Sequence, residues 1–127
     1  MQKATQEQIK NQNTSLVLRT IYQTRSISRA DIARATGLTR PTVSLIVGEL
    51  MELDLVTEIG YGPSVGGKPP LILEFHANSR NILCIDIANT EFRGALVNLR
   101  GDITHRSSLP AEEVTGDEAV QIVYRLI

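Results

Sequence analysis

Apolar side chains recur every three or four residues through three stretches of the first half of the chain, which predicts three helices. The first is expected over residues 10–24, after a polar, frayed stretch at 1–9, and the other two over 28–36 and 39–53. The last of these helices has one apolar row, which is expected to pack on a core and which consists of Val43, Ile46, Val47 and Leu50, with Asp54 in line. Its opposite face, with Pro41, Ser44, Leu45 and Gly48, is expected to remain open.

Residues that begin and end helices separate the second helix from the third. Ser28 is expected to cap the second helix, and Gly37 to end it in the left-handed conformation. Thr39 is expected to cap the third helix, and Pro41 lies in its first turn, where a missing N–H costs little. The second and third helices, joined by this turn, predict a helix-turn-helix. The third helix of the chain is expected to read DNA.

The pattern changes after residue 55. Residues 56–59 and 71–75 alternate and contain β-branched side chains, which predicts two strands of a hairpin. The connecting loop is rich in Gly and Pro and contains Gly66, Gly67 and Lys68. Three helices followed by a hairpin predict a winged helix, in which Gly66 and Gly67 allow close approach and Lys68 reaches a phosphate or a narrow minor groove. The alternative is a passive surface loop with an incidental lysine.

The second half of the chain predicts a separate unit after a linker at 76–80. Strands are expected over residues 81–87, 92–99 and 103–109, followed by a helix over 117–127. We therefore expect an α+β chain with a winged-helix domain at 1–76 and a second domain at 81–127. The second domain is expected to be incomplete, because one helix cannot cover such an apolar sheet and both sheet edges lack partners.

Charge is distributed unevenly along the chain, although the net charge is only −1. Residues 1–40 carry seven basic and two acidic side chains, a balance of +5, whereas the remainder carries six basic and twelve acidic ones. Such asymmetry is typical of a basic binding module fused to a different domain. Chance clustering of cations on a solvated surface is the alternative.

Composition places the chain among globular proteins, with 42% hydrophobic and 21% charged residues. The single cysteine, Cys84, excludes an intrachain disulfide, and the sequence has neither a membrane-spanning apolar run nor a signal-peptide core. We therefore expect a cytoplasmic protein with no membrane partner.

The residues expected to contact DNA follow from these positions. Small polar side chains in the first turns of the third helix suit a major groove, and Leu45 offers an apolar surface for a thymine methyl group. The full set is Arg29, Thr39, Arg40, Thr42, Ser44 and Leu45 from the helices, with Gly66, Gly67 and Lys68 from the wing.

From Asn13 to its end, the chain resembles the ROK family of repressors and sugar kinases. The resemblance lies in the winged helix, the loop Gly-Pro-Ser-Val-Gly-Gly-Lys-Pro-Pro at 62–70, and the strand segments at 85–90 and 95–101. It implies that the second domain is the start of an actin-like ATPase fold, the ROK domain. It also implies a sugar-sensing domain beyond residue 127.

The family's phosphate-cradling turn, Asp-Ile-Gly-Gly-Thr, corresponds here to residues 86–90. Ala88 and Asn89 replace both glycines, and a β-carbon at Ala88 obstructs the close approach of a phosphate. We therefore expect Asp86, Asn89 and Thr90 to form a degenerate turn that binds no nucleotide, with Asp86 capping it. No catalytic residue, cofactor or metal ligand is assigned.

The resemblance and the residues together predict a transcriptional regulator. We expect a repressor of sugar-metabolism genes that binds an inverted repeat in double-stranded DNA as a homodimer or higher oligomer, and whose C-terminal domain binds a sugar effector. A ROK-family sugar kinase with an N-terminal extension, or a winged helix used only for protein contacts, are the alternatives.

Overall fold

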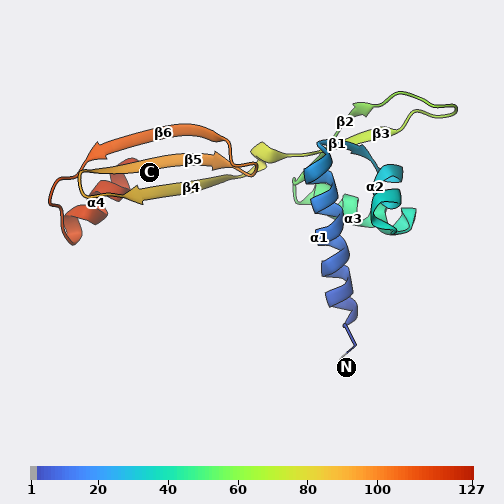
Figure 1. Ribbon diagram of the computed structural model, residues 1–127, viewed down its shortest axis with the longest axis horizontal. Helices are drawn as coiled ribbons and strands as arrows, with labels where there is room; N and C mark the ends of the chain where they lie inside the picture. The colour runs from blue at the N-terminus through green and yellow to red at the C-terminus, as the bar shows by residue number, and fades with distance from the viewer. Residues whose placement is uncertain (1–2) are drawn as a thin grey trace. The chain divides into compact units, whose positions relative to one another are not determined.

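The computed structural model describes residues 3–127, which form two compact units, one ending at His76 and the other starting at Ala77 (Figure 1). The first contains α1 (Gln6–Thr24), β1 (Ser26–Ser28), α2 (Arg29–Thr36), α3 (Arg40–Glu52), β2 (Val56–Tyr61) and β3 (Leu71–Phe75). The second contains the 3-10 helix η1 (Ala77–Ser79), β4 (Asn81–Ile87), β5 (Glu91–Asn98), β6 (Ile103–Pro110) and α4 (Asp117–Leu126). The predicted α+β class and winged helix-turn-helix are confirmed.

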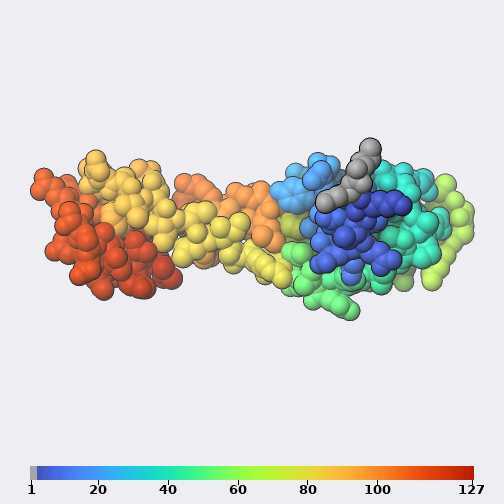
Figure 2. Space-filling model, turned by 90° about the horizontal axis from the view of Figure 1, so that it is seen from below, coloured from blue at the N-terminus to red at the C-terminus, as the bar shows by residue number. Residues whose placement is uncertain are grey.

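Helix α1 begins at Gln6, one turn before the predicted start, because Thr5 and Gln8 form a capping box. The Gln8 N–H donates to Thr5 Oγ1 at 3.2 Å, and the Thr5 N–H donates to Gln8 Oε1 at 2.8 Å. The frayed stretch predicted at 1–9 is therefore wrong from residue 6 onward, and residues 1 and 2 lie outside the described part. The N-terminal turns of α1 extend beyond α2 and α3 in Figure 1 and face the viewer in Figure 2.

The core of the first unit lies where the apolar row of α3 meets the other helices and the sheet. All four apolar members of the predicted row are buried, and Tyr22 packs edge-on against Phe75 with ring centroids 5.0 Å apart. The buried apolar residues are Val17, Ile21, Ile27, Ile32, Val43, Ile46, Val47, Leu50, Val56, Leu73 and Phe75. Asp54 does not extend this row, because it lies beyond the helix end with φ +60°, and its carboxylate contacts His76.

The sheet of the first unit has three strands, in the order β1-β3-β2, rather than the two predicted. The three residues before α2 pair antiparallel with β3, and Ile27 lies opposite Leu73. This places the buried Ile27 under α2 and attaches the start of that helix to the hairpin.

The second unit is an antiparallel meander, β4-β5-β6, with α4 on one face. Its buried apolar residues are few, Phe92, Ala111 and Ile122, and half-buried side chains such as Leu109 and Leu126 pack around them. The predicted linker at 76–80 contains η1, which is held to the meander because the Leu99 N–H donates to Ala77 O at 3.0 Å. Within residues 3–127, no helix combines the length and apolar character needed to cross a membrane.

Candidate nucleic-acid interface

The start of α2 is fixed by Ser28, as the sequence predicted. Ser28 Oγ accepts the Asp31 N–H at 3.2 Å and donates to Asp31 Oδ2 at 2.8 Å. The hydrogen bond from Ser28 is the largest cause that lowers the pKa of Asp31 below 3.8, and Arg34, which is paired with Asp31, adds to this effect against the opposing effect of burial. Asp31 therefore stays ionised next to the positive end of the helix dipole.

The turn between α2 and α3 also has the predicted chemistry. Gly37 has φ +72°, and its N–H donates to Ala33 O at 2.9 Å, which ends α2. Thr39 Oγ1 accepts the Thr42 N–H at 3.4 Å, and Pro41 occupies the first turn of α3. These residues therefore end α2 and begin α3 where the sequence predicted.

The N-termini of α2 and α3 meet the base of the wing around one hollow of about 400 Å³. Its lining brings together Arg29 from α2, Arg40 and Ser44 from α3, and Lys68 from the loop between β2 and β3. These positions are up to 39 residues apart in the sequence, and three of them carry a positive charge. A basic hollow beside an exposed helix is the arrangement that accepts a nucleic-acid backbone.

The wing loop is held in shape by its own hydrogen bonds. The Gly62 N–H donates to Pro70 O at 2.8 Å, and Ser64 Oγ donates to Gly67 O at 2.6 Å. Gly67 has φ +99°, a conformation that L side chains rarely adopt. The exposed Lys68 follows Gly67, so the loop presents a cation directly after a backbone conformation that favours glycine.

The remaining predicted contact residues differ in their exposure and in their side-chain partners. Leu45 is 65% exposed, and Ser44 and Arg40 are exposed as well. The Thr42 and Thr39 hydroxyls hydrogen-bond each other at 2.8 Å, and Thr39 also caps α3. The Arg29 guanidinium lies 2.9 Å from Glu58 Oε1 on β2, a partner that the sequence analysis did not identify.

The second unit has a hollow at the predicted phosphate turn, and none of the described residues that line it is a cation. This hollow is bounded by Ala88, Asn89 and Thr90 and by Glu112 and Glu113. Two carboxylates at this place repel a nucleotide phosphate. The expectation that Asp86 caps the turn is not met, because its carboxylate lies near Arg93 on β5, 3.9 Å from Nε.

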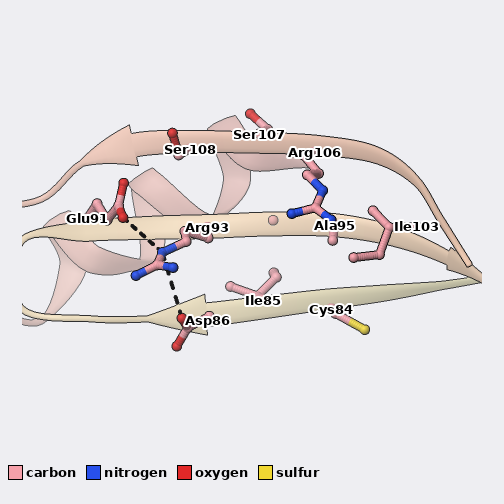
Figure 3. A pocket seen from close by; sticks show the side chains of 11 residues that line it. Cys84, Ile85, Asp86, Glu91, Arg93, Ala95, Ile103, Arg106, Ser107 and Ser108 are labelled. Atoms are coloured by element: carbon pink, nitrogen blue, oxygen red, sulfur yellow. Dashed lines mark ion pairs between the residues drawn. The ribbon is translucent and has the colours of Figure 1, made fainter. Parts of the chain in front are cut away.

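A further hollow of about 480 Å³ lies on the face of this sheet away from α4 (Figure 3). Arg93 lies between Glu91 and Asp86, and its Nε is 2.9 Å from Glu91 Oε1. Ala95 and Ile103 give the hollow an apolar floor, and Cys84 lies at its edge. Arg93 is therefore paired with two carboxylates. No group of His, Cys, Asp and Glu suited to a metal occurs in residues 3–127.

Comparison with known proteins agrees with this geometry. Residues 10–57 match the family described as winged helix-turn-helix DNA-binding. The chain is 34% identical to the xylose repressor of Bacillus spizizenii, over 98% of this chain and 33% of that protein. It is 40% identical to a putative xylose repressor of a Caldicellulosiruptor species, over 75% of this chain and 24% of that one. The chain thus spans about a third of the length of the Bacillus relatives it matches.

A solved structure shares the fold. The ROK family transcriptional regulator described as a homolog of the E. coli MLC protein superposes with a TM-score of 0.69 at 22% identity, over 93% of this chain and 30% of that chain. The chain is thus similar, over nearly its whole length, to the N-terminal third of xylose repressors, and it shares the fold of a ROK family transcriptional regulator, which confirms the resemblance indicated by the motifs.

Proposed function

We propose that this chain is the DNA-binding part of a transcriptional repressor of sugar-metabolism genes. The observation that carries the proposal is the basic hollow, where Arg40, Ser44 and Lys68 converge from two elements beside an open face of α3. The name of the Bacillus relatives, xylose repressor, supports the sugar-metabolism context and a role without catalysis.

Each residue has a proposed role. Four side chains of α3 face the major groove, and the cap residue Thr39 positions them: Arg40, Thr42, Ser44 and Leu45. Lys68 contacts a phosphate or the minor groove, and Gly66 and Gly67 permit this approach. Arg29 borders the same hollow but is already paired with Glu58.

The proposal also covers the whole protein. A sugar effector would act through a domain beyond residue 127, and a homodimer or higher oligomer would place two winged helices on an inverted repeat about one helical turn apart. The DNA partner and the unpaired Cys84 support a cytoplasmic location. Footprinting is the test of symmetry: protection of one asymmetric half-site at high affinity would contradict dimeric binding.

The experiment that tests the function is fluorescence anisotropy with an operator-derived duplex and a scrambled duplex over a salt series. Binding should prefer the operator and weaken steeply as salt rises, because several phosphate contacts release counterions. No salt-dependent affinity would favour a winged helix used for protein contacts. A titration with ATP separates the kinase alternative, for which saturable binding is expected, whereas the acidic hollow at residues 88–113 predicts none.

A further inference from the structure

Arg29 stands apart from the other two cations of the hollow, because a carboxylate already holds it. Its Nη2 lies 2.9 Å from Glu58 Oε1, and the two side chains are 29% and 35% exposed. For Arg40 and Lys68, in contrast, the described residues provide no ion-pair partner. An arginine neutralised in this way attracts a phosphate much less than a free one does.

The same guanidinium connects three elements that build the interface. Arg29 is the first residue of α2, Glu58 lies on β2, and Arg29 Nη2 also lies 3.8 Å from Met51 Sδ in the last turn of α3. It therefore joins the two helices of the helix-turn-helix to the strand that leads into the wing.

Glu58 occupies the point where that strand changes direction. It pairs with Leu73 on β3, and the register then shifts between Glu58 and Gly60, leaving Ile59 as an extra residue. Gly60 has φ +118°. A bulge re-aims a strand and the segment after it, so an anchor immediately before the bulge sets the direction of the wing.

We infer that Arg29 and Glu58 are positioning residues that fix the wing against the recognition helix, and that Arg29 does not itself contact DNA. If Arg29 moved to a phosphate, the Glu58 carboxylate would be left unpaired beside a polyanion, which is unfavourable. The inference rests on the proposed DNA-binding function and replaces the role expected for Arg29 from the sequence.

Four variants test it by operator affinity and by the slope of log affinity against log salt: Arg29→Ala, Glu58→Gln, their double variant, and the reversed pair Arg29→Glu with Glu58→Arg. A positioning pair predicts that each single change weakens binding by about two- to fivefold, as for a part-exposed ion pair. The double variant should then be no weaker than either single one, the reversed pair should recover most of the affinity, and the salt slope should stay unchanged.

The most informative result is whether Glu58→Gln raises or lowers the operator affinity. Removing a negative charge near DNA should by itself strengthen binding, so weaker binding requires a structural role. Glu49→Gln is the matched control, because it removes a carboxylate from the Lys10–Glu49 pair, 2.8 Å long and outside the hollow, and should not weaken binding.

Stronger or unchanged binding by Glu58→Gln, or a salt slope reduced by about one phosphate equivalent in Arg29→Ala, would overturn the inference and make Arg29 a phosphate contact or a bystander. Circular dichroism of each variant shows whether the fold is kept, and the reversed pair keeps the test decisive if Arg29→Ala unfolds. Failure of the proposed function is a different result, namely a parent chain without salt-dependent affinity.

Discussion

Arg40 and Ser44 lie one helical turn apart on the exposed side of α3, and we propose that their side chains read bases. Replacing either with Ala should relax base preference at one or two operator positions, because a lost bidentate contact costs about 1 to 3 kcal/mol. Selection from a randomised site measures this preference. Arg19→Ala, which removes a cation from α1 outside the hollow, is the control, and an unchanged preference in both α3 variants would refute their role.

Ser28 caps the start of α2 and is the largest cause of the lowered pKa of Asp31. Ser28→Ala should lower the free energy of unfolding by about 1 kcal/mol, as for loss of an N-cap, and should raise the pKa of Asp31 toward 3.8. Because the folded pKa is the lower one, the ionised Asp31 stabilises the fold above the unfolded pKa. This contribution is lost as pH falls through the folded value, below about pH 4.

An NMR titration of the Asp31 carboxyl measures this shift directly. Thr39→Ala, which removes the cap of α3 instead, should destabilise the fold without moving the pKa of Asp31. A Ser28→Ala protein in which Asp31 titrates as in the parent would contradict the assigned cause.

The sequence predicts residue-scale features that depend on near neighbours, and it misses those that depend on distant ones. The caps at Ser28, Gly37 and Thr39 each involve a partner three or four residues away, within reach of a sequence motif. The partner of Arg29 is 29 residues away, across a sheet whose register no local pattern reveals.

At the scale of elements, the wing combines the positive charge of Lys68 with the left-handed backbone conformation of Gly67. Lys68→Ala should weaken binding to most duplexes and reduce the salt slope by about one phosphate equivalent, since an exposed lysine acts without base preference. Gly67→Val should also weaken binding with the charge still in place, because a branched side chain opposes φ +99° and holds the loop away from the groove.

Both wing changes should leave the melting temperature nearly unchanged, because the loop adds little to the core. Val65→Ala is the matched control: Val65 is 97% exposed in the same loop and carries neither charge nor an unusual backbone angle. Affinities like the parent's across the salt series, in both Lys68→Ala and Gly67→Val, would make the loop a passive connector.

Element boundaries that the sequence missed have local physical causes. Strand β1 is three residues long, too short to show alternation, and it exists because β3 provides its hydrogen-bond partners. Strand β2 extends to Tyr61 rather than 59 because a bulge absorbs Ile59 and lets Gly60 and Tyr61 rejoin the ladder. The bounds of α3 and β4, in contrast, were predicted to within one residue.

At the scale of the whole molecule, the two units differ in how much apolar surface they bury. Among residues 3–127, eleven apolar residues are buried in the first unit and three in the second, whose strand β4 exposes Ile82, Leu83 and Ile87. We therefore expect two unfolding transitions, with the second unit unfolding first. Hydrogen exchange resolved along the chain should show faster exchange in residues 81–110 than in α1 and α3, and one coincident transition would contradict this expectation.

We propose above all that α3 and the wing form one DNA-binding surface around the hollow at the start of α2. Amide chemical shifts of the chain, followed by NMR as an operator duplex is added, test it most directly. We predict that the perturbed amides cluster at residues 28–30, 39–45 and 62–70, and that those of β4, β5 and β6 change little. Perturbations centred on the second unit, or none at all in the first, would show that α3 and the wing do not form the DNA-binding surface.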